Sequence, residues 1–343
     1  MRAVRYQQFG TLPEIVDVDR PTCPPDGVVV EVAATGVCRS DWHAWRGHDD
    51  SVHLPHVPGH EFAGVVVEVG AEVRHHRLGA RVTAPFVFAC GTCRECLAGQ
   101  TQVCTRQEQP GFTLPGSFAE LLAVPHADVN LVALPDAVAF VDAAGLGCRF
   151  GTAYHALHER GRVRAGEHVV VVGCGGVGLS AIVVAVAAGA HVVAVDVSPA
   201  ALARAAALGA DTVTSGPTAL DEVRARTDGG AHLSIDAFGS RATSVTAVAS
   251  LRPRGRHVQV GLLLDEEAAP AIPMGRVIAE ELELLGSHGI SVGEYAAMLD
   301  DIVTGRLDPG VTLGRTITFD ELPDALVAMD GPASQAGMTV ALV

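Results

Sequence analysis

Short apolar runs, rich in valine and broken by glycine and proline, follow one another along the first third of the chain. Apolar residues that alternate with polar ones, or that continue without a break over a few positions, are typical of β-strands. This part of the chain therefore predicts a β-rich, barrel-like domain. Its clearest runs lie at 27–37, 63–70, 80–87 and 118–125.

The pattern changes near residue 166, because a buried strand, a glycine turn, a helix and a second buried strand fill 167–196. Helical and extended segments then keep alternating, which is the rhythm of a doubly wound parallel sheet. Beyond residue 287 the elements are mixed again, with an amphipathic helix expected at 293–305 and a strand followed by a helix at 316–329. We therefore expect an α/β protein with a β-rich domain at 1–149, an inserted nucleotide-binding domain at 150–286 and a return to the first domain at 287–343.

Composition narrows the range of partners. The chain has 343 residues, enough for two domains, and a net charge of −15 with no run of lysine or arginine. Binding to nucleic acid or to a membrane surface is not expected, because both depend on clustered positive charge. The N-terminus lacks the apolar core of a signal peptide, and the most apolar stretch, 181–195, contains a glycine and a histidine. We expect a cytoplasmic protein.

Four of the eight cysteines lie within one short stretch and have the spacing C-x2-C-x2-C-x7-C; they are Cys90, Cys93, Cys96 and Cys104. In the cytoplasm such a cluster indicates metal ligands or a redox pair sooner than disulfides. Four thiolates close a tetrahedral zinc site and leave no open position, so this site should be structural. The alternative, a redox pair, leaves two cysteines unexplained and lacks a thioredoxin-like context.

A second metal site is suggested by Cys38, His60 and Cys148, which are far apart in sequence. Three protein ligands would leave the fourth position of a zinc ion free for water or substrate. Taken singly, each residue is weak evidence, since a lone buried cysteine is more often a packing residue.

Other histidines compete for this role. His53 and His56 precede His60 in the stretch 53–60, but Pro55 and Pro58 hold it extended, and we expect both histidines to be loop or surface residues. The same interpretation applies to the pair His75–His76.

The glycine-rich stretch GCGGVG lies directly after the predicted strand 168–172 and at the head of a helix. This strand–turn–helix context makes GxGxxG a candidate dinucleotide site, in which glycines let the backbone reach the pyrophosphate at the helix N-terminus. Asp196 ends the next strand, where a carboxylate would bind the adenosine ribose and repel a 2′-phosphate, so NAD is favoured over NADP. The stretch supplies the candidate cofactor residues Gly173, Gly175, Gly176, Val177 and Gly178.

Taken together these motifs carry a family resemblance. The stretch 59–73 resembles the signature of the zinc-containing alcohol dehydrogenases of the medium-chain dehydrogenase/reductase superfamily, and 38–47 resembles the segment that holds their catalytic zinc. The four-cysteine stretch resembles their structural-zinc lobe. The resemblance covers essentially the whole chain and implies a GroES-like catalytic domain around an inserted Rossmann domain.

The resemblance also implies roles for single residues. Cys38, His60 and Cys148 fall on the catalytic-zinc ligands, and Glu61 is the neighbouring carboxylate that can approach the metal. The remaining roles are Asp41 as the partner that orients His60, Ser40 as the hydroxyl on the substrate oxygen, His43 as the proton-relay histidine, Arg39 on the cofactor pyrophosphate, and Thr152, Phe238 and Val260 beside the nicotinamide. Each of these last three also fits an ordinary core residue.

Two departures from the family pattern concern the cofactor. Ala201 stands where many relatives carry a lysine, and Met338 stands where many carry an arginine that helps to bind pyrophosphate. Arg39 would then be the main cationic contact, and NAD would bind comparatively weakly.

We therefore expect an enzyme with two zinc ions per chain that transfers a hydride between an alcohol and NAD and interconverts the alcohol with an aldehyde or ketone. The alternatives are a polyol or amino-alcohol dehydrogenase of the same superfamily and a non-catalytic fold relative. Trp42, Trp45 and Phe112 either line an apolar substrate cleft or fill the core. The family implies a homo-oligomer, with a tetramer favoured and a dimer possible.

Overall fold

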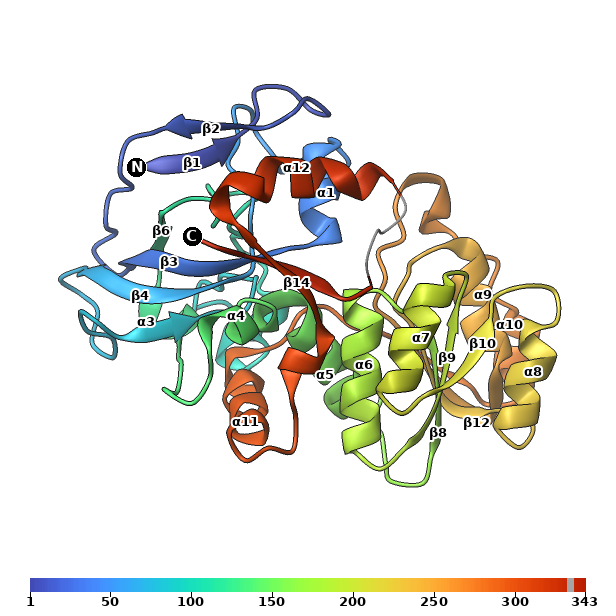
Figure 1. Cartoon of the computed structure of the whole chain (residues 1–343). Coiled ribbons are helices and arrows are strands. Elements are labelled where there is room, and N and C mark those ends of the chain that lie inside the picture. Colours follow the sequence, from blue (N-terminus) through green and yellow to red (C-terminus); the bar gives the residue numbers. More distant parts are fainter. Residues whose placement is uncertain (332–335) are drawn as a thin grey trace.

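The computed structural model describes residues 1–331 and 336–343, and its chain forms two sheet-containing regions joined by a helical segment (Figure 1). Within these residues one sheet is parallel and six-stranded, in the order β10-β9-β8-β11-β12-β13. The other is mixed and seven-stranded, in the order β14-β15-β3-β4-β5-β7, with β6 paired to β3. No described helix is long and apolar enough to cross a membrane.

The parallel sheet is built from the strand–helix alternation expected from the sequence. Its strands are β8 (His168–Val172), β9 (His191–Asp196), β10 (Asp211–Thr214), β11 (Ala231–Asp236), β12 (Leu251–Gln259) and β13 (Glu283–Gly286). The elements that follow these strands are α6 (Gly176–Ala187), α7 (Pro199–Ala207), α8 (Ala219–Arg226), α9 (Arg241–Ala249), η4 (Asp265–Ala268) and α10 (Met274–Ala279). The direction of winding reverses between β8 and β11, and ligands of such sheets bind at the carboxyl ends of the strands at this point.

The mixed sheet contains both the first third and the end of the chain. Its strands are β3 (Val28–Val37), β4 (Phe62–Val69), β5 (Arg81–Thr83), β6 (Leu121–Val124), β7 (Val132–Ala133), β14 (Leu313–Thr318) and β15 (Met338–Leu342), and β1 (Arg2–Arg5) pairs separately with β2 (Glu14–Asp17). Because β15 pairs with β3 in antiparallel fashion, the C-terminus returns to the N-terminal region, as the sequence predicts.

Short helices cover the ends of this region and connect it to the parallel sheet. They are α1 (Arg39–Trp45), α2 (Arg94–Leu97), η1 (Thr101–Val103), α3 (Ala127–Asn130), α4 (Phe140–Ala143), the π-helical turns η2 (Leu146–Phe150) and η3 (Ala156–Arg160) with α5 (Gly151–His155) between them, α11 (Val292–Val303), η5 (Pro309–Thr312), η6 (Phe319–Glu321), α12 (Leu322–Val327) and η7 (Ala328–Asp330). The expected amphipathic helix is α11, which begins at a capping box formed by Ser291 and Glu294.

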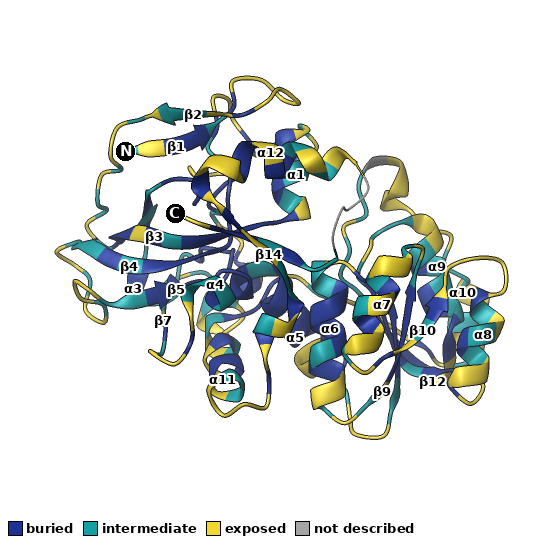
Figure 2. Ribbon diagram, viewed as in Figure 1, coloured by how far each residue is buried: buried dark blue, intermediate teal, exposed yellow. Residues whose placement is uncertain are grey.

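One of several hydrophobic clusters reaches from the parallel sheet to the mixed sheet. The cluster that contains Val169 and Ile182 of the parallel sheet and its first helix also contains Phe150 of the connecting segment and Ala63 of the mixed sheet. Figure 2 shows β3 and β9 mostly buried and the outer faces of α7 and α8 exposed. Most of residues 143–157 in the connecting segment are buried, so its polar side chains Arg149, Thr152 and His155 lie in the interior.

Candidate active site

Three side chains from distant parts of the sequence meet beside the connecting segment. The Sγ atoms of Cys38 and Cys148 and a ring nitrogen of His60 all lie within 4.8 Å of one another, and all three groups are buried. Cys38 sits at the junction of β3 and α1, His60 precedes β4, and Cys148 lies in the π-helical turn η2. The fold thus gathers the three residues that the resemblance implies as ligands of the catalytic zinc.

Asp41 fixes the orientation of the His60 ring. Its Oδ1 lies 2.7 Å from His60 Nδ1 and accepts the Gly59 backbone N–H at 3.1 Å, while its Oδ2 accepts the Cys38 backbone N–H at 2.9 Å. His60 Nε2 is buried and has no hydrogen-bond partner within the described part of the chain. Because a carboxylate can only accept, Nδ1 carries the proton, and Nε2 is the nitrogen that can bind a metal once the ring is neutral.

Ionisation of the two thiols is strongly coupled. A hydrogen bond with Cys148 and the nearby His60 hold the pKa of Cys38 well below its usual value, while the same Cys38 contact and burial raise the pKa of Cys148. Burial opposes the charged form of His60, but the charge and hydrogen bond of Asp41 outweigh it, so that the pKa of His60 lies well above its usual value. A divalent cation would relieve this competition for protons, since Cys binds metals as the thiolate and His as the neutral ring.

Glu61 is buried beside this site and is bound by Arg149. The backbone N–H and Nε of Arg149 donate to Glu61 Oε1 at 2.9 and 3.1 Å, and its Nη2 donates to Oε2 at 2.5 Å. A fourth donor, Nη1, reaches the Val37 carbonyl at 3.2 Å. No role was expected for Arg149 from the sequence. The signal that could have indicated one is a charged residue directly after a ligand cysteine in an otherwise apolar stretch.

Arg39, Ser40 and His43, which are expected to contact the cofactor or the substrate, all lie on the short helix α1. Ser40 Oγ lies 3.9 Å from Cys38 Sγ, and Nδ1 of the half-buried His43 lies 3.0 Å from His48 Nδ1. Arg39 donates to the Met329 carbonyl and stacks on the Trp42 ring at 4.4 Å. The guanidinium is therefore held at the edge of α1.

Aromatic side chains close the other side of the His60 ring. The Phe112 ring lies 5.5 Å from it and the Phe86 ring 6.2 Å, both in edge orientation. Phe112 is thus beside the candidate site, whereas Trp45 is 1% exposed and packs in the core with Tyr6. Phe112 is itself only 6% exposed and belongs to the same cluster as Trp45, so both residues fit the core alternative, with Phe112 at the edge of the cluster that faces His60.

The other histidines do not join this group. His53 is exposed, and His75 and His76 lie in an exposed loop. His56 is also in a loop, but the expectation that it could be a surface residue is wrong, because it is only 6% exposed and its ring packs against that of Tyr6.

The four cysteines of the lobe also come together. Cys93 Sγ lies 3.4 Å from Cys96 Sγ and 3.8 Å from Cys104 Sγ, and Cys104 Sγ lies 3.5 Å from Cys90 Sγ. All four sulfurs lie within 4.8 Å of one another and none is bonded to another. Four thiols around one point match the tetrahedral donor set of a closed zinc site.

Backbone and side-chain hydrogen bonds already prepare part of this lobe for the thiolate form. A backbone hydrogen bond from Thr92 is the largest of the effects that lower the pKa of Cys90 to about 5, and one from Cys96 is the largest that lowers the pKa of Cys93 to about 7. Burial, in contrast, raises the pKa of Cys96 to about 12. The exposed Arg106 donates to Cys90 Sγ at 3.3 Å and supports its negative charge.

The glycine-rich loop lies at the carboxyl end of β8, next to the loop after β11. Gly173 has φ +90°, and a Cβ there would lie 2.9 Å from the Phe238 side chain. A Cβ on Gly178 would lie 1.8 Å from the Gly173 carbonyl oxygen, so glycine allows helix and strand to approach. At Gly175 a Cβ would meet nothing within 4 Å, which leaves the backbone open toward a ligand.

Asp196 is held in place at the end of β9. Its Oδ2 accepts the Cys174 backbone N–H at 2.6 Å and its Oδ1 accepts the Ser198 N–H at 2.8 Å. Each carboxylate oxygen keeps a further lone pair that could accept a ribose hydroxyl. The residue is therefore fixed to the glycine-rich loop that it is expected to serve.

The three residues expected beside the nicotinamide differ in exposure. Phe238 is 66% exposed, so the alternative that it is an ordinary core residue is wrong. Val260 is half-buried, whereas Thr152 is 7% exposed and its Oγ1 is buried without a hydrogen-bond partner among the described residues. An unpartnered buried hydroxyl is a group that a bound ligand could satisfy.

A parallel sheet with a glycine-rich loop at its switch point, beside a buried group of three candidate metal ligands, fits the class of metal-dependent dehydrogenases. Two family models agree with this class: the alcohol dehydrogenase GroES-like domain matches residues 24–136, and the zinc-binding dehydrogenase model matches residues 176–304. An alcohol dehydrogenase of Geobacillus stearothermophilus is 34% identical over 334 residues, 96% of each chain, and an L-threonine 3-dehydrogenase of Sinorhizobium medicae is 31% identical over 320 residues, 90% of each. The solved alcohol dehydrogenase TADH from Thermus sp. ATN1 superposes over 100% of both chains with a TM-score of 0.91 and 32% identity.

The chain belongs to the zinc-containing alcohol dehydrogenase family of the medium-chain dehydrogenase/reductase superfamily. It is an oxidoreductase of the alcohol dehydrogenase type, with a GroES-like domain and a Rossmann domain. The family resemblance and the fold class expected from the sequence are confirmed.

Proposed function

We propose that this protein is a zinc-dependent, NAD-linked alcohol dehydrogenase that reversibly oxidises a primary or secondary alcohol to an aldehyde or ketone. The observation that carries the proposal is the buried Cys38–His60–Cys148 group, in which His60 Nε2 has no hydrogen-bond partner among the residues that the structure describes. Three protein ligands leave one position of a zinc ion for the substrate oxygen, which the ion would polarise as a Lewis acid.

The remaining residues would serve the proton and the hydride. Ser40, two residues after the first ligand, would accept the hydroxyl proton of the alcohol and pass it through the cofactor ribose to His43. Phe86 and Phe112 would exclude water around His60, which favours apolar alcohols, including aromatic ones. Hydride transfer would require the nicotinamide to lie on the Thr152 side of the pocket. Thr152 Oγ1 has no hydrogen-bond partner among the described residues and could bind the cofactor there.

The cofactor would lie across the carboxyl ends of β8 and β9. Its pyrophosphate would meet the glycine-rich loop and the start of α6, where backbone N–H groups have no helical partner. Asp196 would bind the adenosine ribose and disfavour the 2′-phosphate of NADP. Arg39, held by Met329 and Trp42, would approach the pyrophosphate from α1.

The four-cysteine lobe would hold a second, structural zinc. We further propose that the domains divide at 1–149, 150–286 and 287–343, that the protein is cytoplasmic, and that it works as a homo-oligomer, with a tetramer favoured. Ala201 and Met338 remove two cations that many relatives have, so NAD is proposed to bind comparatively weakly.

A second candidate is an amino-alcohol or polyol dehydrogenase. The observation that favours it is the similarity to L-threonine 3-dehydrogenases over 90% of this chain. The two candidates share the metal and cofactor chemistry and differ only in the substrate.

The test is the absorbance of reduced cofactor, with NAD and NADP offered separately to primary, secondary, benzylic, polyol and amino alcohols, L-threonine included. Reduction of NAD with one alcohol class supports the proposal and names the substrate group. Absence of reduction across the panel, in protein shown to hold two metals per chain, would instead support the non-catalytic fold relative.

The cofactor assignment has its own variant. Asp196→Ala should raise the KM for NAD roughly tenfold, the effect of losing a good hydrogen bond to a charged group, and should reduce the preference for NAD over NADP. An unchanged ratio of the two cofactors would show that Asp196 does not bind the ribose. Thermal unfolding of the variant serves as the control, because Asp196 also holds two backbone N–H groups.

A further inference from the structure

Arg149 is a charged side chain in a place that the fold otherwise fills with apolar groups. It is 5% exposed, and its neighbours Leu146 and Phe150 in the same turn are fully buried. It directly follows the ligand candidate Cys148. Burial of a guanidinium costs free energy unless all its donors are hydrogen-bonded, so the contacts of Arg149 must account for its position.

The guanidinium end of Arg149 holds Glu61 in a fixed position. Three donors of Arg149 bind the two carboxylate oxygens, in the two-point geometry that suits an arginine and a carboxylate. The pair occupies the space that a side chain at position 36 would take, because a Cβ on Gly36 would lie 2.2 Å from Glu61 Oε2 and 2.6 Å from Arg149 Nη2. Glu61 is the residue after His60, and the pair therefore holds a carboxylate immediately beside the metal pocket.

The stem of the same side chain supports the cofactor loop. A Cβ on Gly176 would lie 2.5 Å from Arg149 Cδ and 3.3 Å from its Cγ, so the stem lies directly against the first residue of α6. That end of α6 is where the pyrophosphate is proposed to bind. Arg149 thus contacts both halves of the proposed active site.

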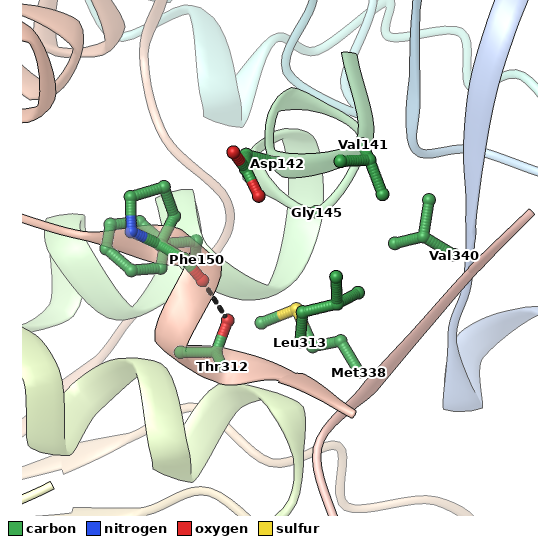
Figure 3. A pocket seen from close by; sticks show the side chains of 9 residues that line it. Val141, Asp142, Gly145, Phe150, Thr312, Leu313, Met338 and Val340 are labelled. Atoms are coloured by element: carbon green, nitrogen blue, oxygen red, sulfur yellow. Dashed lines mark hydrogen bonds between the residues drawn. The ribbon is translucent and has the colours of Figure 1, made fainter. Parts of the chain in front are cut away.

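The residue at position 338 provides no other cation near this contact. Met338 is 3% exposed and lines a small apolar cavity of about 10 Å³ with Phe150 and Val340, and its Sδ would lie 3.0 Å from a Cβ on Gly145 (Figure 3). The end of β15 therefore supplies no cation, and the cavity has room for about one water molecule and no substrate. The buried cation of this region comes instead from the turn that holds Cys148.

We propose that Arg149 is a positioning residue that keeps the Glu61 carboxylate off the metal of the Cys38–His60–Cys148 pocket and, through its stem, supports the glycine-rich loop at Gly176. The proposal rests on the proposed function, since it assumes a metal in the pocket and a dinucleotide on the loop. Without the guanidinium, Glu61 would be a buried carboxylate with no counter-charge, and the nearest cation would be the pocket metal. A carboxylate oxygen is a good ligand for zinc and cobalt.

The guanidinium is tested with Co²⁺ as the probe metal in the buried pocket. Arg149→Met keeps a stem of similar length and removes the two guanidinium donors to Glu61 and the positive charge, while the backbone N–H still reaches Glu61 Oε1. We expect its visible cobalt spectrum to change because Glu61 becomes a ligand, and we expect the double variant Arg149→Met/Glu61→Gln to return to the wild-type spectrum. An unchanged spectrum in folded Arg149→Met overturns this part. Should Arg149→Met fail to fold, Arg149→Lys takes its place, because it keeps the charge but cannot hold both oxygens, and the same spectral criterion then applies.

The stem is tested in the Glu61→Gln background, where no unpaired charge is left in the core. Arg149→Met/Glu61→Gln should bind NADH within about twofold of Glu61→Gln, as measured by the fluorescence of the bound cofactor. Arg149→Ala/Glu61→Gln removes the support beneath Gly176 and should weaken NADH binding roughly tenfold. Equal affinities of the two double variants overturn this part.

The wild-type protein separates the two levels of inference. If it takes no metal into the buried pocket or binds no NADH, the proposed function itself fails. If it does both and the Arg149 variants behave as wild type, only the role of Arg149 fails.

Discussion

The two cysteine sites use similar donors and are built in opposite ways. The lobe takes four thiols from a single stretch, and two of them, those of Cys90 and Cys93, are only half-buried. The pocket takes its three donors from separate elements and buries them in the layer between the sheets. We therefore expect the lobe to depend on its proposed metal for its shape, whereas the pocket is held in place by the fold.

The residues that hydrogen-bond to the ligands of the two sites, or lie behind them, also differ in burial. In the pocket, the buried Asp41 orients His60 and caps the start of α1, and the buried Arg149–Glu61 pair lies behind the thiols. In the lobe, the outer partner is the exposed Arg106. Buried partners act at short range in a low dielectric, and exposed ones are screened by water and salt. The comparison predicts a graded series of variants.

The largest effect is expected for Cys38→Ser. It removes one of three ligands from the pocket, so turnover should fall by at least about 10³-fold while the fold and the lobe metal persist. Initial rates, metal content per chain and circular dichroism check the three points. Cys23→Ser is the matched control, because the Cys23 thiol donates to the Pro24 and Gly27 carbonyls and belongs to neither cysteine group, so the rate should stay within about twofold of wild type. Retained activity in Cys38→Ser would exclude the catalytic-zinc assignment.

Asp41→Asn should have the next largest effect. The amide cannot serve the His60 ring and the Cys38 N–H equally well, so the metal affinity of the pocket should fall about 10- to 100-fold, with the lobe unchanged. Competition with a chelator, followed by metal analysis, measures each site. Asp49→Asn, which alters a carboxylate that accepts the backbone N–H and the hydroxyl of Ser51, is the control. Equal loss from both sites would mean that Asp41 acts through the general stability of the fold.

Cys93→Ser should affect stability more than catalysis. A lobe that loses its metal loses the link between its segments, so the melting temperature should fall by about 5–10 °C while the rate at low temperature changes only a few-fold. Thermal unfolding and initial rates are measured on the same preparation. A rate that falls as steeply as in Cys38→Ser would show that the lobe takes part in catalysis.

The difference between the sites also explains what the sequence could predict. The spacing of Cys90 to Cys104 is local, and a local spacing is visible in one stretch of sequence. The pocket could be assembled only through the family resemblance, since nothing in the pattern places Cys148 beside Cys38. The strands around Gly173 and Asp196 were predicted closely because buried parallel strands are continuous apolar runs.

What the sequence did not predict are contacts made across the fold. In the sequence Arg149 lies in an apolar stretch that gives no sign of a carboxylate partner. The packing of β3, β4 and η2 brings that partner, Glu61, to it. The exposure of Phe238 follows from the turn that Asp236 holds through the Phe238 and Gly239 N–H groups, which no periodicity indicates. Local patterns thus fix elements, and their meeting points require the structure.

The smallest effect is expected for Arg106→Gln. The Arg106 guanidinium donates to Cys90 Sγ and is exposed to water, so the variant should weaken metal binding by the lobe only about two- to threefold. The difference from wild type should shrink as the salt concentration rises from about 0.05 to 0.5 M, because exposed charges are screened, whereas the effect of Asp41→Asn on the pocket should hardly change. Chelator competition at both salt concentrations measures this contrast. A salt-independent loss at Arg106, or a salt-dependent one at Asp41, would contradict the division into a solvent-screened lobe and a fold-enclosed pocket.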